Sequence, residues 1–560
     1  MKKIRYSVIA VTILFLISGF GGLYGSALAG DTVTSVFGTW LSLLPPLAAI
    51  IMALVFRQVL LALFVGIWMG TWLVGEMSLL SVFTSFFTSL TQYIVPATAD
   101  TDHMSIIIFS LLIGGIIGII TDNGGTRGII SFISDYIKTK VKGQLVTALM
   151  GFVIFFDDYA NTMVVGNTMR PLTDKLKISR AKLAYLVDST AAPVATIALI
   201  STWIGAMVGY IDSAGQGLTG FDEAAYSVFI QSLPYNFYAF FTIIFVLMIA
   251  WSGRDFGPML TSRKNLYKAR HDPDFDDYNI YHEAKDEREP TNKVSHWSNA
   301  AIPILTLIFG VIGGLFITGE GSSVQDIVAS ADSYSALLWG SLFAVVVAIM
   351  MSVSRRLLTI DETLDGMFKG MHVMFNGVLI LVLAWALSAQ TVDLGTADYL
   401  VSVFGEVLNP LWIPVLVMII SALTAFATGS SWGTMGILMP LVLPLAWKLG
   451  GDAGLDPEIT LIVIYASVSS VLAGSVWGDH CSPISDTTIL SSIASQCDHV
   501  EHVRTQLPYA TVGGLLSIAA LIFVVVFDIH WLLIYPSGIV IMAIVIFKFG
   551  RRPNPDDYMP

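Results

Sequence analysis

The chain has 560 residues, of which 55% are hydrophobic and only 12% are charged. Soluble domains carry about 25% charged residues. With a mean hydropathy of +0.75, a soluble fold is therefore excluded and an integral membrane protein is predicted. The net charge of -12 offers no basic surface, so no nucleic-acid partner is expected. The long apolar runs favour membrane-spanning helices over the strands of a barrel.

The N-terminus combines a basic head with an apolar run. Met1-Lys2-Lys3-Ile4-Arg5 precedes a run that extends from Tyr6 to Tyr24. Ala27-Leu28-Ala29 is similar to the end of a cleavable signal peptide. Because the run is long enough to span a bilayer by itself, we favour an uncleaved helical anchor over a signal peptide for residues 1–38.

Two transmembrane repeats are predicted on either side of a hydrophilic loop. Residues 39–252 form the first repeat and residues 298–507 the second, followed by closing helices and a tail at 508–560. The loop at 253–297 is dense in both signs of charge and is predicted to be a cytoplasmic linker. The predicted fold is all-α, with about 12–14 helical segments.

Short polar stretches that break helices interrupt the apolar runs in both halves. They begin at Thr121, Asp157, Asp188, Thr391, Thr428 and Asp479. Thr121 and Gly125 recur as Thr391 and Gly395, and Thr162 recurs as Thr434, in the same order and at nearly constant spacing. Polar breaks at corresponding places in two halves are typical of secondary transporters.

Clusters of Lys and Arg predict the orientation. These clusters lie near the N-terminus, in residues 170–182 and 253–297, at Arg355-Arg356 and in the C-terminal tail. An excess of Lys and Arg is characteristic of cytoplasmic loops. Both termini are therefore predicted inside. Residues 144–172 then run from outside to inside and residues 411–447 from inside to outside, so the repeats are inverted and their broken helices meet at the midplane.

One cluster conflicts with this orientation. Lys138, Lys140 and Lys142 would face outside if 144–172 crossed the membrane inward. A re-entrant hairpin near 104–142 is one way to remove the conflict, and the sequence leaves that topology open.

Asp157-Asp158 is the sharpest chemical signal. A carboxylate at mid-membrane costs about 2.5–3.5 kcal/mol, and helical neighbours point about 100° apart, so we expect one of the two to face a cavity. Asn161 and Thr162 lie about one turn further on a nearby face. Such oxygens suit a small cation such as Na+. The alternative is a structural cluster that ties the break together.

Other candidate residues lie at the remaining breaks. Asp188 and Asp479 are alternatively caps of the half-helices that follow, and the acids near residues 122 and 393 are alternatively turn formers. The candidate ion- or proton-binding residues are Asp157, Asp158, Asn161, Thr162, Asp188, Ser189, Thr190, Ser430, Ser431, Thr434, Asp479, Ser482 and Asp486, with Asp122, Asn123, Asp393 and His480 as a second tier.

Buried carboxylates can couple two ions by competition. Burial favours the neutral carboxyl, whereas a bound cation favours the charged form. Na+ and H+ would then exclude each other from one site, and their movements would be coupled. No cofactor is expected apart from these transported ions. Cys481 and Cys497 are predicted to be free thiols because no metal-binding spacing accompanies them.

Three motifs resemble those of the NhaC-type sodium/proton antiporter family. They are Phe155 to Thr162, Asp188 to Pro193, and Gly478-Asp479-His480-Cys481-Ser482-Pro483-Ile484-Ser485-Asp486-Thr487. The resemblance covers about residues 40–530. It implies inverted repeats, cation/proton exchange, a bacterial inner-membrane location and often a homodimer. By motif match it carries over Asp157, Asp158, Asn161, Asp188, Asp479 and Asp486.

Three functional hypotheses follow. The first is exchange of Na+ or Li+ for H+ by alternating access. The second is ion-coupled transport of a small organic acid or amino acid, as in some relatives of the family, with Trp432, Trp477 and His480 available for recognition. The third, an intramembrane hydrolase using Ser482, His480 and Asp479, is disfavoured because close sequence neighbours rarely form a triad. No enzymatic activity is therefore expected.

Overall fold

The computed structural model describes residues 36–552, except for 57, 76, 135–136, 217, 261, 263–295, 322–326, 328–330 and 405–407. The predictions for the N-terminal anchor and for most of the 253–297 linker lie outside the described residues. The described chain is helical, as predicted, and its β pairing is limited to one bridge between Asp255 and Arg551.

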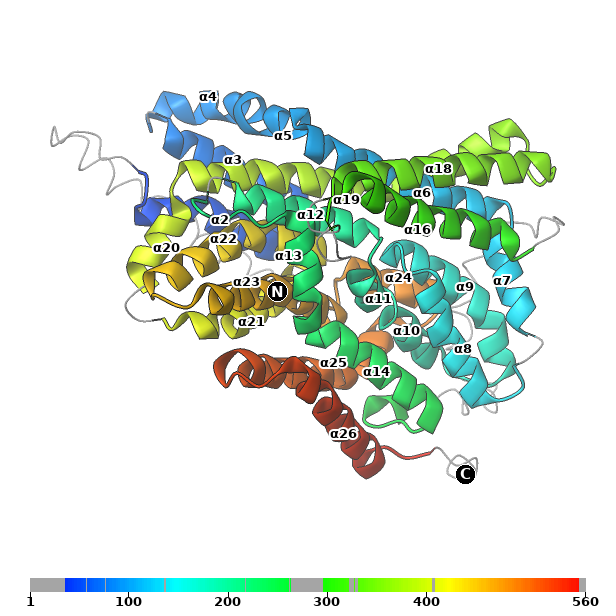
Figure 1. Cartoon of the computed structure of the whole chain (residues 1–560). Helices are drawn as coiled ribbons and strands as arrows, with labels where there is room; N and C mark the ends of the chain where they lie inside the picture. Colours follow the sequence, from blue (N-terminus) through cyan, green and yellow to red (C-terminus); the bar gives the residue numbers. More distant parts are fainter. Residues whose placement is uncertain are drawn as a thin grey trace, which may run out of the picture.

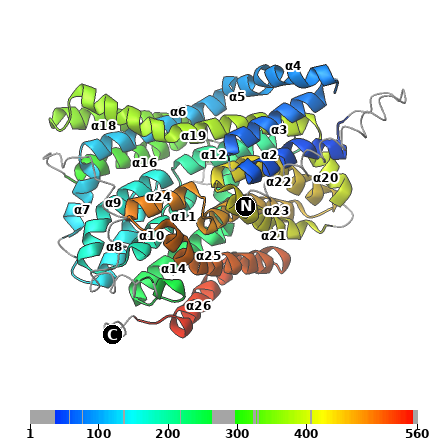
Figure 2. The ribbon, with the colours of Figure 1, turned by 180° about the vertical axis from the view of Figure 1, so that it is seen from behind.

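The helices of the first half form a chain of short and long segments (Figure 1; seen from behind in Figure 2). They are η1 (Trp40–Leu43), α2 (Leu44–Phe56), α3 (Val59–Val74), α4 (Leu79–Ser89), η2 (Leu90–Ile94), α5 (Val95–Ala99), α6 (Thr101–Asp122), α7 (Gly125–Ser134), α8 (Lys140–Val153), α9 (Asp158–Lys175), α10 (Arg180–Asp188), α11 (Ala192–Ile197), α12 (Thr202–Gly215), α13 (Ala225–Ser232), η3 (Leu233–Tyr235) and α14 (Phe237–Ser252).

The second half repeats the pattern with longer segments. Its helices are α16 (Ser298–Thr318), α18 (Ser333–Ser354), α19 (Ile360–Asp393), α20 (Thr396–Phe404), η5 (Pro410–Trp412), α21 (Ile413–Thr428), α22 (Ser431–Asp452), α23 (Pro457–Cys481), α24 (Asp486–Ser495), α25 (His499–Leu521), η6 (Ile522–Val526) and α26 (Trp531–Phe549).

Within the described residues, nine helices are long and apolar enough to cross a membrane, or up to eleven if each of two bent pairs counts as one span. The bent pairs are α10–α11 with α12, at 48°, and α13–η3 with α14, at 49°. The most apolar stretches of α22 and α23 are 78% buried, whereas that of α26 is 22% buried. The first two are therefore the most enclosed of these spans, and α26 lies at one edge of the molecule (Figure 1).

The predicted crossing at 144–172 is wrong, because α8 and α9 form a hairpin. Gly143, near the start of α8, packs against Leu176 and Ile178, which follow α9. The open ends of the two helices therefore lie together, and the turn at 154–157 is the tip. Lys140 and Lys142 consequently lie at the same end as the basic residues of 170–182. This placement removes the conflict between the predicted orientation and the positions of Lys140 and Lys142. The hydropathy of a segment could not resolve it, because hydropathy does not show whether the chain crosses the membrane or turns back.

The predicted crossing at 411–447 is also a hairpin. Gly474 of α23 packs against Met418 of α21, and Gly478 packs against Ala422, so α21 and α23 run in the same direction. The start of α23 folds back on the end of α22, where Gly450 meets Thr460. Helices α21 and α22 therefore run antiparallel, and Gly429-Ser430 forms the tip of this second hairpin.

Two broken spans connect the open ends of the hairpins. The first, α10–α12, starts beside hairpin α8–α9 and ends near α22, where Thr219 accepts a hydrogen bond from Trp447 (3.2 Å). The second, α23–α24, starts at the open end of hairpin α21–α22 and ends at Ser495, whose carbonyl accepts from Arg180 (3.0 Å). The spans run in opposite directions, so the hairpins enter from opposite ends. The repeats are inverted, as predicted.

Helices α6 and α19 are the matching long helices of the two repeats and pack antiparallel. Gly114 of α6 lies against Gly370 of α19, and Gly118 lies against Gly366. Small residues let helix backbones approach closely, and this packing matters in a membrane because burying apolar surface away from lipid contributes little to helix association. This contact runs along one edge of the molecule (Figure 1).

The base of the first broken span is held by two ion pairs. Arg180 pairs with Asp174 (2.8 Å). Lys182 pairs with Asp255 (2.5 Å), and both of these side chains are buried. Asp255 also forms the bridge to Arg551. The C-terminal end of the described chain therefore lies at the same end as the basic loop 170–182.

Gly429 gives a first testable prediction. Its φ of 71° is left-handed, which costs an L-residue about 1–2 kcal/mol, and a Cβ there would lie 2.5 Å from the Ile484 carbonyl oxygen. We expect Gly429→Ala to lower stability by about 1–3 kcal/mol beyond the backbone cost, measured as thermal unfolding of purified protein.

Gly454→Ala is the matched control for Gly429→Ala. Gly454 has a φ of 64° but no neighbouring atom within 4 Å of the added Cβ. It should therefore show the backbone cost alone. Equal losses in the two variants would mean that the hairpin tip does not press on the break between α23 and α24.

Candidate functional site

The tip of hairpin α8–α9 is held by the side-chain amide of Asn161. Its Nδ2 donates to the carbonyl oxygens of Gly151 (2.7 Å), Ile154 (3.0 Å) and Thr190 (3.1 Å). Thr190 belongs to the break between α10 and α11, so one amide joins two breaks. The structural role considered for this cluster is therefore present. The Oδ1 of Asn161 has no hydrogen-bond partner among the described residues.

Asp157 and Asp158 are both buried, at 1% and 0% exposure, but they meet different surroundings. Asp157 Oδ2 accepts from Thr202 Oγ1 (3.0 Å), in the first turn of α12. Neither carboxylate oxygen of Asp158 has a hydrogen-bond partner within the described chain. The two neighbours therefore diverge, as expected for adjacent positions where a helix begins.

Asp158, Asn161 and Thr162 form what we call the carboxylate site, in the first turns of α9. Spacings of three and four residues place these side chains on one helix face. Four of their buried acceptor atoms lack a partner among the described residues: both oxygens of Asp158, Asn161 Oδ1 and Thr162 Oγ1. Buried polar atoms are normally paired, so these four oxygens leave hydrogen-bonding capacity unused within the described residues.

Two indole donors lie beside the carboxylate site. Trp203 acts on the Asp158 carboxylate as a hydrogen-bond donor, although its Nε1 lies outside regular hydrogen-bond geometry with any described acceptor. The rings of Trp203 and Trp432 meet edge to face, with centroids 5.7 Å apart, and Trp432 Nε1 is likewise unpaired. The site therefore offers N–H donors as well as oxygens.

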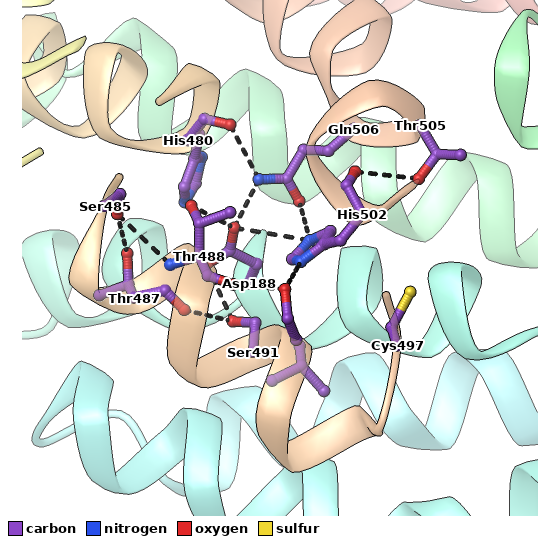
Figure 3. Close-up of polar contacts among 12 residues, drawn as sticks. Asp188, His480, Ser485, Thr487, Thr488, Ser491, Cys497, His502, Thr505 and Gln506 are labelled. Carbon is purple, nitrogen blue, oxygen red and sulfur yellow. Dashed lines mark hydrogen bonds and ion pairs between the residues drawn. The ribbon is translucent and has the colours of Figure 1, made fainter. Parts of the chain in front are cut away.

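Asp188 has fully engaged oxygens, in contrast to Asp158. Ser491 donates to Oδ1 (3.0 Å), and Thr488 (3.3 Å) and Gln506 (2.5 Å) donate to Oδ2 (Figure 3). His502 Nε2 lies 3.8 Å from Oδ2. Asp188, Thr488, Ser491, His502 and Gln506 are named the Asp188 network below. It joins the end of α10 to α24 and α25.

Neither Asp188 nor Asp479 caps the half-helix that follows it. Helix α11 begins after Ala191, which makes no side-chain cap, and α24 is capped by Ser485. Asp479, 2% exposed, instead accepts from Thr487 Oγ1 (2.6 Å). The interpretation of both acids as helix caps is wrong, because each carboxylate instead accepts hydrogen bonds from hydroxyl groups of α24.

The acids of the two repeats share one neighbourhood. Asp158 and Asp479 interact electrostatically, as do Asp479 and Asp188. Asp486 interacts with Asp479 and lies in the first turn of α24, but its side chain is exposed. Four predicted acids are thus buried at the meeting of the breaks, and Asp486 lies at the rim.

Several predicted hydroxyls serve the local backbone. Ser430 caps α22 by accepting from Gly433, and Thr434 donates to the Ser430 carbonyl. Thr190 donates to Leu186, and Ser482 accepts from Ile484. Ser189 and Ser431 are buried at the start of their breaks. These residues shape the breaks more than they present free oxygens.

The second-tier residues fall into two groups, one beside the Asp188 network and one elsewhere in the fold. His480 borders the Asp188 network, since its carbonyl accepts from Gln506 (3.0 Å) and its Nδ1 pairs with Tyr238. Its Nε2 has no partner among the described residues, so His480 does not bond Ser482 as a hydrolase would require. The remaining three make structural contacts elsewhere: Asp122 with Lys369, Asn123 with Ser352, and Asp393 with Tyr93.

Sequence reasoning missed Trp203, His502 and Gln506. The closing helix was predicted to start near residue 508, whereas α25 starts at His499. His499, His502 and Gln506 are spaced by three and four residues, and that spacing is a helical signal. The polar character of this stretch concealed it, because an apolar run was taken to define the helix.

Comparisons with known proteins agree on the class of molecule. Residues 194–526 match the model of a family described as the Na+/H+ antiporter family. A Haemophilus influenzae protein described only as uncharacterized is 31% identical over 523 residues, which cover 91% of this chain and 95% of that protein. The arginine/ornithine antiporter ArcD of Halobacterium salinarum is 29% identical over 239 residues, 43% of each chain.

A solved structure shows the same fold. The Neisseria gonorrhoeae MtrF transporter, whose structure is described as illuminating a class of antimetabolite efflux pumps, superposes with a TM-score of 0.54. It is 16% identical and covers 80% of this chain and 85% of its own. At that identity the similarity concerns the fold alone.

Proposed function

We propose that this chain, which belongs to the Na+/H+ antiporter family, exchanges Na+ for H+ across the membrane. The chain is a multi-pass membrane protein, and its family carries out antiport. The observation that carries the finer proposal is the carboxylate site, where four buried oxygen atoms of α9 form no regular hydrogen bond with the described residues.

The carboxylate site suits Na+ as cargo. Asp158 supplies a negative charge, and Asn161 Oδ1 and Thr162 Oγ1 supply neutral oxygens. Among the described residues, no group of three or more His, Cys, Asp or Glu side chains is arranged to hold a metal. One carboxylate with neutral oxygens beside a broken backbone fits a monovalent ion better than zinc.

We assign Na+ to the carboxylate site and leave Asp188 to protons. Both Asp188 oxygens already accept hydrogen bonds, so a cation there would have to displace donors. Asp158 can hold either Na+ or H+, and Asp188 and Asp479 add buried acids that interact with one another and, through Asp479, with Asp158. Competition at Asp158 then couples the two ions.

The inverted hairpins supply the two-sided access that exchange requires. Their tips come from opposite ends and meet the breaks of both spans. We place the chain in a bacterial inner membrane with the open end of hairpin α8–α9 inside, because Lys140, Lys142 and the loop 170–182 gather there. The backbones of Arg551 and Asp255 hydrogen-bond to each other at that same end, which supports a cytoplasmic C-terminus.

A second candidate is Na+-coupled transport of a small organic carboxylate. The specific observation is the pair of buried indole N–H groups on Trp203 and Trp432, which lack partners among the described residues. Na+ offers no acceptor for them, whereas a carboxylate does. The relative ArcD is described as an arginine/ornithine antiporter, so an organic cargo is chemically reasonable for this fold.

An ion-only liposome assay tests the proposal. Purified protein is reconstituted in vesicles that contain a pH dye and no organic solute, and Na+, Li+ or K+ is added outside. We expect Na+ and Li+ to drive proton movement and K+ to have little effect. If Na+ moves protons only after lactate, malate or an amino acid is supplied, exchange of Na+ for H+ alone is wrong and the second candidate replaces it.

A further inference from the structure

A chain of hydrogen bonds leads from the edge of the molecule to His502, whose ring lies beside buried Asp188. His499, the first residue of α25, is partly exposed. Its Nδ1 lies 3.1 Å from Ser492 Oγ, which in turn lies 3.0 Å from His502 Nδ1. His502 Nε2 lies 3.0 Å from Gln506 Oε1 and 3.8 Å from Asp188 Oδ2. Both His502 and Asp188 have 0% exposure.

Acceptor-only atoms fix the position of the proton on His502. The Gln506 Nε2 faces the Asp188 carboxylate and the His480 carbonyl, both of which can only accept. Gln506 must therefore turn its Oε1 toward His502, so His502 Nε2 carries a hydrogen. Its Nδ1 is then a lone pair in the neutral ring, or a second N–H in the charged ring.

Ser492 is short of protons for its three neighbours. Its one hydroxyl hydrogen faces the Thr488 carbonyl (2.8 Å), His499 Nδ1 and His502 Nδ1. His499 Nε2 faces the Pro483 carbonyl (2.7 Å) and so carries a hydrogen. With both rings neutral, three acceptors would share one hydrogen. One extra proton on either imidazole turns that ring into a donor and leaves two acceptors for the Ser492 hydrogen, so it reduces this mismatch.

We propose that His499, Ser492 and His502 form a proton relay that loads and unloads Asp188. The inference rests on the proposed exchange of Na+ for H+. A proton on His499 Nδ1 passes to Ser492 Oγ while the Ser492 hydroxyl hydrogen passes to His502 Nδ1. His502 then releases its Nε2 hydrogen to Asp188 Oδ2, which becomes a neutral carboxyl. In the reverse direction Asp188 returns a proton to His502 Nε2 while the Nδ1 hydrogen leaves through Ser492 to His499, which unloads Asp188 and restores the starting tautomer.

The relay opens at the end of the molecule that carries the basic loop. Helix α24 ends at Ser495, whose carbonyl binds Arg180, and Arg180 also binds Gln496 (3.1 Å) in the turn before α25. By the assignment above, this end is cytoplasmic. The relay therefore serves proton exchange between Asp188 and the cytoplasm.

Burial opposes a charge on the His502 ring, and the neighbouring Asp188 carboxylate is the group that offsets it. Asp188 of α10 faces the ring, and among neighbouring imidazoles His499 of α25 and His480 of α23 interact with it. Helix α24 contributes the hydroxyls of Ser492 and Thr488 and no charge at this point. The nearest carboxylate is therefore the acid that the relay would serve. Histidine is also the side chain that ordinarily changes charge between pH 5 and 8.

The relay separates two transport modes that a structural role would not separate. In the same vesicles, exchange of internal Na+ for external labelled Na+ requires no net proton movement, whereas Na+-driven pH change requires it. We expect His502→Gln, which keeps a side chain able to hydrogen-bond, to slow the pH change by about tenfold or more. Its Na+/Na+ exchange should stay within about twofold of the unmodified protein.

Ser492→Ala is the second variant, because it removes the relay hydroxyl with little change in volume. Ser517→Ala is the matched control on α25, since Ser517 is buried and donates only to the Gly513 carbonyl in the described structure. We expect Ser492→Ala to lose the pH change selectively and Ser517→Ala to retain both modes.

Three outcomes have distinct meanings. Selective loss of the pH change in His502→Gln and Ser492→Ala supports the relay. Equal loss of both modes, or full retention of the pH change in either variant, overturns it. If the unmodified protein moves Na+ but never drives a pH change with Na+, the proposed exchange itself fails, and this result is recognisable before any variant is made.

Discussion

Replacing Asp158 with asparagine is expected to weaken Na+ binding by about 30-fold or more, because loss of a buried charge partner costs about 2 kcal/mol at least. Na+ should stabilise the unmodified protein against heat, by about 2.7 kcal/mol at a hundred times its dissociation constant. At the same Na+ concentration, a variant that binds Na+ 30-fold more weakly should keep at most about 0.9 kcal/mol of this stabilisation. Thermal unfolding of the purified protein in Na+ and in K+ measures this difference.

The same variant should be at least as stable as the original in the absence of Na+. Asp158 is fully buried and its carboxylate has no hydrogen-bond partner among the described residues. Burying a charge without a partner is costly, and asparagine removes that cost. A gain in stability together with a loss of Na+ response would indicate a residue that is retained for function.

Asp122→Asn is the control for Asp158→Asn. Asp122 ends α6 and lies 3.7 Å from Lys369, whose side chain is 73% exposed. An exposed ion pair contributes at most about 1 kcal/mol, so the variant should keep both its stability and its Na+ response. Unchanged Na+ affinity in Asp158→Asn would remove Asp158 from the proposed site.

Asn161→Leu is expected to lower stability by at least about 3 kcal/mol. The substitution keeps the volume but removes the amide that binds the carbonyls of Gly151, Ile154 and Thr190. Each buried acceptor left unsatisfied costs about 1–3 kcal/mol. Because the amide joins two breaks, the hairpin tip should separate from α10–α11. Thermal unfolding and the yield of folded protein measure the loss.

Asn167→Leu makes the same change two turns later on α9. The amide of Asn167 is exposed and donates to the Met163 carbonyl (2.8 Å) within its own helix. Water can replace that contact, so we expect a loss below about 1 kcal/mol. If both variants were equally stable, the three bonds made by Asn161 would not hold the hairpin tip in place.

The sequence located the breaks but not the direction of the chain after them. Polar stretches at Thr121, Asp157 and Asp188, and their counterparts in the second half, all coincide with helix ends in the structure. Breaks are local, because Gly, Pro and polar side chains compete with helical hydrogen bonds on the spot. Whether the next helix continues or returns depends on contacts such as that of Gly143 with Leu176.

The site shows the same division between local and distant causes. Asp157, Asp158 and Asn161 were found because carboxylates and amides inside apolar runs are costly and therefore conspicuous. His502 and Gln506 were missed because their position beside Asp188 follows from packing across more than three hundred residues of sequence. No local pattern in either segment records that contact.

The sequence by itself determined that this protein is a helical membrane transporter with two similar halves, because composition, span length and repeated breaks are properties of the chain alone. Only the tertiary structure decided that both long broken segments are hairpins and that Asp158 is unpaired while Asp188 is fully bonded. Those outcomes depend on which side chains arrive from other helices, and hydrogen-bond satisfaction in a low-dielectric interior is a property of the assembled neighbourhood.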